Sequence, residues 1–195
     1  MTKNTSTLNL RMTIYCAFFT ALIIVGGFIS IPIPISPVPI VLADFFIMLT
    51  GLFLGLKHGL ISTSLYIALG TIGLPVFAGG RGGLIVFFGP TGGFLFGYLA
   101  MVVFIGFISD KMKPKISSFL IALIGGNILL YLIGVPWLRI VTNISWSAAI
   151  ATGFIPFAPG AIFKIIAAIA IGHTYFIKLK RAPISSSHRG DDVVS

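Results

Sequence analysis

An all-α integral membrane protein with six transmembrane helices is the fold that the sequence predicts. Only 9% of its 195 residues are charged and 57% are hydrophobic, whereas soluble domains carry about 25% charged residues. The mean hydropathy is +1.10. Uncharged stretches recur along the chain, and each approaches the roughly 20 residues that a helix needs to cross a bilayer.

The expected helices cover residues of about 12–31, 41–56, 59–77, 90–109, 116–135 and 159–177. They form one membrane domain at 12–177, between an N-terminal segment at 1–11 and a basic, then polar, tail at 178–195. The first span is too long for the core of a signal peptide, and no small-residue cleavage site follows it. We therefore expect an uncleaved first helix.

The distribution of basic residues predicts the orientation. One side of the expected bundle has only Arg81 and Arg139. The other side has Lys3, Arg11, Lys57, Lys111, Lys113, Lys115, Lys178, Lys180, Arg181 and Arg189. The positive-inside rule then places both termini in the cytoplasm. Because the cations lie between apolar segments, the net charge of +9 reflects membrane orientation, and we expect the lipid bilayer and no nucleic acid as a partner.

Two outer connections have unusual composition. Residues 31–39 are apolar but contain four prolines, which lack an N–H group and exclude a helix. Extended apolar backbone near a membrane is tolerated where it packs on protein or lines a cavity, so we expect a lid or plug. Residues 136–158 include Trp137, Arg139 and Trp146 and are expected to form an interfacial stretch with aromatic anchors.

Two ionisable residues interrupt the expected helices. Lys164 lies about 7 Å below the outer end of the sixth span, at 1.5 Å per residue, and follows a helix start at Pro159. With the helix dipole it predicts a site for an anionic group, although a lysine snorkelling to the interface is the alternative. Asp44 lies at a similar depth, where it either pairs with Lys164 as a structural ion pair or accepts hydrogen bonds from ligand N–H groups.

Arg81 stands alone between four glycines, at residues 79–83. Its guanidinium is suited to hold a carboxylate with two hydrogen bonds, and the glycines would let the backbone approach a ligand closely. A solvated arginine in a flexible loop is the alternative. The glycine spacing does not match a phosphate-binding loop.

Other groups in the spans are smaller candidates. Thr91 and Asn127 are placed to contact a small ligand, but such residues more often hydrogen-bond between helices, and for Asn127 that second interpretation is preferred. Ala17 and Ala21 form a small-x-x-x-small pattern, which lets another helix approach. No arrangement typical of a catalytic or metal site is found, so we expect neither an enzyme nor a bound metal or cofactor.

Five short motifs together carry a specific resemblance. They are Ser-Pro-Val-Pro-Ile at 36–40, Gly-Leu-Pro-Val-Phe-Ala-Gly-Gly at 73–80, Gly-Pro-Thr-Gly-Gly-Phe at 89–94, Gly-Val-Pro-Trp-Leu at 134–138 and Pro-Phe-Ala-Pro-Gly at 156–160, with Lys164 four residues later. This combination resembles the BioY family, the biotin-capturing S subunits of energy-coupling-factor (ECF) vitamin transporters. The resemblance covers residues of about 10 to 178.

The resemblance implies the six-helix fold of an ECF S component, with a biotin pocket near the outer surface. The loop between the first two helices would cover this pocket. Arg81 and Lys164 would serve the biotin carboxylate or the ureido oxygen, and Phe77, Phe94 and the backbone at Gly83 would shape the walls. It also implies that Ala17 and Ala21 contact a transmembrane coupling subunit, which works with two ATPase subunits in a prokaryotic plasma (inner) membrane.

The chain departs from the family pattern at two positions. Ala161 stands where an aspartate is usual, and Ala43 where a glutamine is common. We hypothesise that Asp44, next to the second departure, supplies the missing carboxylate and engages the ureido N–H groups or Lys164. An S component for another vitamin or precursor is the nearest alternative. A membrane enzyme of unrelated class and a structural membrane protein without a ligand are more distant ones.

Overall fold

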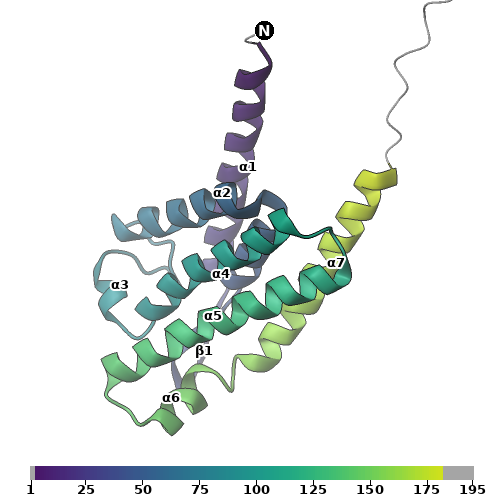
Figure 1. Ribbon diagram of the computed structural model, residues 1–195. Helices are drawn as coiled ribbons and strands as arrows, with labels where there is room; N and C mark the ends of the chain where they lie inside the picture. Colours follow the sequence, from purple (N-terminus) through teal and green to yellow (C-terminus); the bar gives the residue numbers. More distant parts are fainter. Residues whose placement is uncertain (1–2, 182–195) are drawn as a thin grey trace, which may run out of the picture.

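The computed structural model describes residues 3–181, which form a helical bundle with one small hairpin (Figure 1). The elements in order are α1 (Lys3–Phe28), β1 (Ser30–Ile33), β2 (Ser36–Val41), α2 (Ala43–Thr71), α3 (Ile85–Phe88), α4 (Gly92–Lys111), α5 (Ile116–Thr142), α6 (Trp146–Gly153) and α7 (Ala158–Arg181). Four helices of the described chain are long and apolar enough to cross a membrane. A fifth span results if α6 and α7, which meet at 43°, are counted together.

Helix α2 contains two of the expected spans, joined by a sharp bend at Gly55. Gly55 has φ 67° and ψ −168°, a conformation that only glycine adopts without strain. The end of α4 satisfies the backbone there, because Leu56 N donates to Asp110 Oδ2 at 2.9 Å and Ser109 Oγ donates to the Leu52 carbonyl at 2.8 Å. The bend thus lies next to the connection expected at Lys57.

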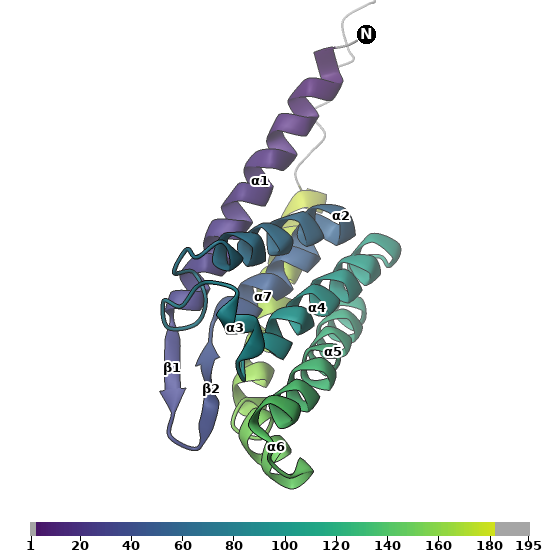
Figure 2. The same cartoon turned by 90° about the vertical axis from the view of Figure 1, so that its left-hand side faces the viewer.

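The proline-rich segment is extended, as expected, but it forms a β-hairpin, so the fold is not purely helical. β1 and β2 are antiparallel, with Ser30 opposite Val41 and Ile31 opposite Ile40. Proline is compatible with such a two-stranded ribbon because both strands are edges. The amide of Leu42 donates to the carbonyls of Gly26 at 3.0 Å and Ile29 at 3.2 Å. These bonds hold the base of the hairpin at the end of α1 (Figure 2).

The glycine-rich segment ends the third expected helix earlier than predicted. That helix was expected to reach residue 77, but α2 ends at Thr71. Phe77 N donates to the Arg81 carbonyl at 2.9 Å, and Arg81 N donates back at 3.3 Å. Gly79 and Gly80, at φ 69° and 72°, make the tight turn between them. These two glycines are therefore required for the turn that precedes Arg81.

Helix α5 extends beyond its expected end at residue 135 and runs through Pro136 to Thr142. Membrane helices tolerate proline because neighbouring groups satisfy the carbonyl that it leaves free. Asn143 ends α5 in the left-handed conformation at φ 53°, a common helix stop. The stretch expected to be interfacial is therefore largely helical, with α6 starting at the Ser145 cap.

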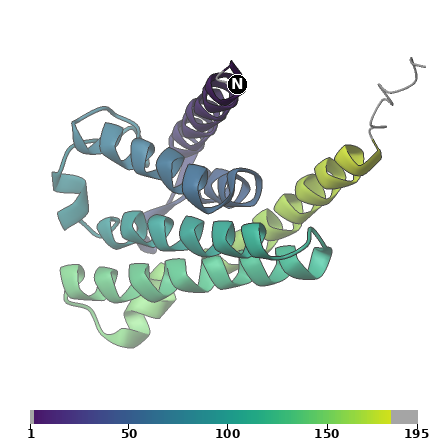
Figure 3. The ribbon, with the colours of Figure 1, turned by 45° about the horizontal axis from the view of Figure 1, so that its top comes forward.

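The helices pack so that α4 lies between α2 and α5, and α1 lies on the far side of α2 from α5 (Figure 3). The Thr20 hydroxyl of α1 lies between two acceptors, the Cys16 carbonyl of its own helix at 2.8 Å and the Ser62 carbonyl of α2 at 3.1 Å, which places α1 against the second arm of α2. Ala17 and Ala21 are exposed. The hairpin lies beside the ends of α1, α2 and α6 (Figure 2).

Candidate ligand-binding site

A pocket lies behind strand β2, between both arms of α2 and helices α4, α5 and α7. Its lining residues are Gly27, Val38, Pro39, Ile40, Val41, Ala43, Asp44, Tyr66, Phe77, Ala78, Arg81, Val86, Thr91, Phe94, Leu95, Tyr98, Leu130, Tyr131, Phe157 and Lys164. Four consecutive residues of β2 form part of the wall, as expected of a lid. Most of the lining is apolar, with a few polar groups, which is the usual composition of a small-molecule site.

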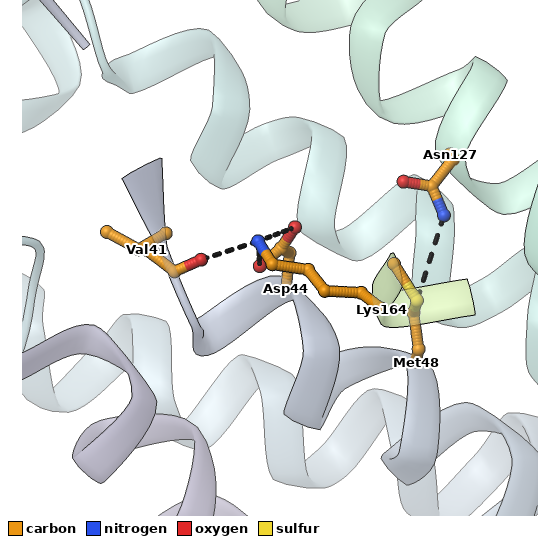
Figure 4. Close-up of polar contacts among 5 residues, drawn as sticks. All are labelled: Val41, Asp44, Met48, Asn127 and Lys164. Carbon is orange, nitrogen blue, oxygen red and sulfur yellow. Dashed lines mark hydrogen bonds and ion pairs between the residues drawn. The ribbon is translucent and has the colours of Figure 1, made fainter. Parts of the chain in front are cut away.

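An ion pair lies in the wall of this pocket. Lys164 Nζ lies 2.7 Å from Asp44 Oδ1 and 2.9 Å from Oδ2, and it donates to the Val41 carbonyl at 2.6 Å (Figure 4). The side chains are only 13% and 9% exposed. The lysine therefore points into the protein and does not snorkel to the interface.

The hydrogen bonds within this pair determine which donors and acceptors remain free for a ligand. An ammonium group has three N–H donors, and Lys164 uses them on Asp44 and Val41. A ligand can take a bond from Lys164 only by displacing one of these acceptors. The Asp44 carboxylate, in contrast, has more lone pairs than the bonds to Lys164 require. The pair therefore presents an acceptor for ligand N–H groups.

Asp44 is placed by the start of α2. It lies in the first turn of that helix, where free backbone N–H groups and the helix dipole stabilise a negative charge. Lys164 reaches it from the second turn of α7, and Val41 ends the lid strand. One cation thus links the lid, α2 and α7.

Arg81 lines the same pocket but differs from Lys164. Its side chain is exposed, and no described residue forms a hydrogen bond or ion pair with its guanidinium. The turn made by Gly79 and Gly80 places it at the pocket wall. Thr91, just before α4, also lines the pocket, and its hydroxyl has no hydrogen bond within residues 3–181. Arg81 is thus a cation with free donors.

Aromatic rings form the apolar walls. Phe77 is buried and lies edge-on to Tyr66 at 5.6 Å and to Phe87 at 6.1 Å between ring centroids. Tyr66, Tyr98 and Tyr131 also line the pocket, and none of them was among the site residues expected from the sequence. Sequence reasoning also missed the Val41 carbonyl, since a backbone group carries no sequence signal.

Three other residues that the sequence singled out lie outside this pocket. Asn127 donates to the Leu123 carbonyl at 2.9 Å and contacts Met48 Sδ at 3.8 Å, apart from the ion pair (Figure 4). It lines a separate groove between α5, α6 and α7, as does Ala161. Gly83, at φ 91°, donates to the Gly70 carbonyl at 2.7 Å and has a backbone role.

The fold and the pocket define a multi-pass helical membrane protein that holds a small molecule behind an extended lid. Residues 1–181 match the model of the BioY family. The chain is 37% identical over 175 residues to the biotin transporter BioY of Thermotoga maritima, covering 90% of this chain and 99% of that one. It is 39% identical over 163 residues to the biotin transporter BioY of Lactococcus lactis subsp. cremoris, covering 80% and 86%. The chain belongs to the BioY family.

A solved structure is also similar. The crystal structure of the S-component for biotin from an ECF-type ABC transporter aligns with a TM-score of 0.81 and 36% identity, covering 91% of this chain and 95% of that chain. The curated relatives are named as transporters and not as enzymes. The fold of this chain is therefore similar to that of an S-component, as the sequence motifs predicted.

Proposed function

We propose that this protein is the biotin-capturing S subunit of an ECF transporter. It binds biotin at the outer side of the membrane and delivers it inward with an ECF coupling module. The observation that carries the proposal is the pocket behind the hairpin. This pocket places an acceptor carboxylate, aromatic walls and a free cation around one small space.

The hydrogen bonds at Lys164 support one orientation of biotin. Biotin has a ureido ring with N–H donors, an apolar chain and a terminal carboxylate. The ring donors match Asp44, the one described carboxylate in the wall, and the Lys164–Asp44 pair is already neutralised. The biotin carboxylate needs a cation with free donors, which Arg81 supplies. Asp44 thus takes the place of the carboxylate that is absent at Ala161.

The same proposal includes six transmembrane spans with both termini in the cytoplasm. The two arms of α2 serve as separate spans, and α6 with α7 forms the last. Ala17 and Ala21 are exposed on α1 and face a transmembrane coupling subunit, because small residues let helices approach closely. That subunit works with two ATPase subunits in a prokaryotic plasma membrane.

Binding of biotin and of its uncharged methyl ester to the purified full chain tests this orientation. We expect Arg81→Gln to weaken biotin about tenfold, the lower range for a charge-assisted hydrogen bond, and to leave the ester unchanged. Asp44→Asn should weaken both ligands by a similar factor, since both contain the ureido ring.

Two outcomes would overturn the proposal. If Lys164 held the biotin carboxylate, Arg81→Gln would bind biotin and its methyl ester as the wild type does. Lys164→Ala would then bind biotin no better than the ester. If the wild type bound no biotin, the ligand would be another vitamin or precursor, and competition with labelled candidates would identify it.

A further inference from the structure

The outer end of α5 has a second cation that the biotin pocket does not use. The Arg139 guanidinium carbon lies 4.6 Å from the centre of the Trp146 ring, an arrangement that fixes the arginine over the aromatic face. Its Nε is buried and has no hydrogen-bond partner among residues 3–181. The acidic residues of the described chain are Asp44, which pairs with Lys164, and Asp110, which caps Leu56. No described carboxylate therefore neutralises Arg139.

An apolar groove begins beside this cation and follows α5. Ile124, Ile128, Leu132 and Pro136 line it from α5 at intervals of four residues, and Arg139 continues the same face of the helix. Trp146 and Ile150 of α6 and Ile162 of α7 form the opposite wall. The side chains are far from close-packed here, since Leu132 is 63% and Ile162 59% exposed.

The dimensions of the groove suit one leaflet of a bilayer. From Ile124 to Pro136 the groove extends about 18 Å at 1.5 Å per residue, and one leaflet of the hydrocarbon core is about 15 Å deep. Arg139 and Trp146 then lie at the level of the outer headgroups, where tryptophan is enriched. The groove is lined by α5, α6 and α7, and α5 and α6 lie on the far side of the bundle from α1 (Figure 3), so a coupling subunit docked on α1 leaves it open.

We propose that this groove binds one phospholipid of the outer leaflet. The lipid phosphate accepts hydrogen bonds from the free guanidinium N–H groups of Arg139, and one acyl chain lies along Ile128 and Leu132. The charge argues for a phospholipid over a partner helix, because the headgroup supplies the anion that the described chain lacks. This inference does not rest on biotin as the ligand.

Native mass spectrometry of the full chain in maltoside detergent tests the proposal. Dioleoyl phosphatidylglycerol is titrated against dioleoylglycerol, which has the same chains but no phosphate. We expect Arg139→Gln to weaken the first phosphatidylglycerol bound about tenfold and to leave dioleoylglycerol unchanged. Leu132→Trp should weaken both lipids by filling the groove, and its exposed position keeps the fold intact.

The matched control is Lys115→Gln, which removes one positive charge at the opposite end of the same helix and should bind both lipids as the wild type does. Equal losses in Arg139→Gln and Lys115→Gln would mean unspecific charge attraction and would overturn the proposal. Unchanged lipid binding by Leu132→Trp would also overturn it. So would a loss of assembly with the coupling module in these variants while lipid binding stayed normal, since a partner helix would then occupy the groove.

Discussion

The pocket behind the hairpin and the groove along α5 share Tyr131 as a wall, yet they are built on different principles. In the pocket, a buried cation is paired with Asp44 and covered by β2. In the groove, the cation Arg139 lies at one end and has no anion among the described residues, and the wall is open and apolar apart from Asn127 and Tyr131. The comparison teaches that this protein neutralises the cation of its enclosed pocket internally, whereas the cation at its open groove has no counter-ion among the described residues, as the proposed lipid site requires.

The largest expected effect comes from breaking the pair in the pocket. Asp44→Leu would leave the Lys164 ammonium buried without its counter-ion, and removing one partner of a buried pair costs about 3–5 kcal/mol. We expect a loss of this size in the free energy of unfolding in detergent. The double variant Asp44→Leu/Lys164→Leu should recover most of it, but not biotin binding. A double variant as unstable as the single one would contradict the ion-pair explanation.

A smaller effect tests whether Asp44 replaces a carboxylate at position 161. Ala161 lines the groove, but it lies one turn before Lys164 on α7, so the longer side chain of an aspartate there is within reach of the Lys164 ammonium. We expect Asp44→Asn to weaken biotin about tenfold and an added Ala161→Asp to restore most of the affinity. Equilibrium binding of labelled biotin measures both. No recovery in the double variant would show that a carboxylate must come from α2.

The shared wall links the two sites more weakly. Tyr131 lies edge-on to Phe154 at 5.0 Å and to Phe94 at 6.5 Å between ring centroids, contacts worth about 1 kcal/mol. If the Tyr131 ring gives each ligand a contact of the same size, Tyr131→Ala should weaken both biotin and phosphatidylglycerol about fivefold. Tyr131→Phe is the control and should bind like the wild type, because the hydroxyl has no hydrogen bond within the described chain. A loss in Tyr131→Phe would mean that the hydroxyl contacts a ligand.

The smallest effect is expected where the two sites are independent. Leu132→Trp fills the groove and lies outside the pocket lining, so biotin affinity should change by less than about twofold, the size of ordinary surface substitutions. The same titration of labelled biotin measures it. A marked loss would show that occupancy of the groove controls the pocket, and the two sites would no longer be separate.

The sequence predicted the ion pair as one of two alternatives, because the depth of a residue in a membrane helix follows from its distance in residues from the helix start. Asp44 and Lys164 each follow a helix start by a few residues, so both were expected at the same level, and they meet there. Sequence reasoning could not reach Val41, whose carbonyl acts as an acceptor regardless of its side chain. The three tyrosines of the wall were missed because an aromatic residue inside a span has the same sequence context whether it faces lipid, core or ligand.

The fold differs from the sequence prediction where contacts between distant segments outweigh the structural preference of a single residue. Proline argues against a helix interior, yet α5 continues through Pro136, with Trp137 Nε1 bonded to the Gly89 carbonyl at 3.1 Å. The proline-rich segment was rightly expected to be extended, but strand pairing depends on a partner segment that composition does not specify. For Asn127 the sequence favoured a hydrogen bond between helices over a ligand contact, and its amide does contact Met48 Sδ of α2 at 3.8 Å.

The structure of the biotin complex, solved by crystallography or electron microscopy, tests the central claim most directly. The account predicts ureido nitrogens within hydrogen-bond distance of the Asp44 carboxylate, an intact bond from Lys164 to Asp44, and the biotin carboxylate on Arg81. A biotin carboxylate bound to Lys164, with Asp44 displaced from it, would contradict the account.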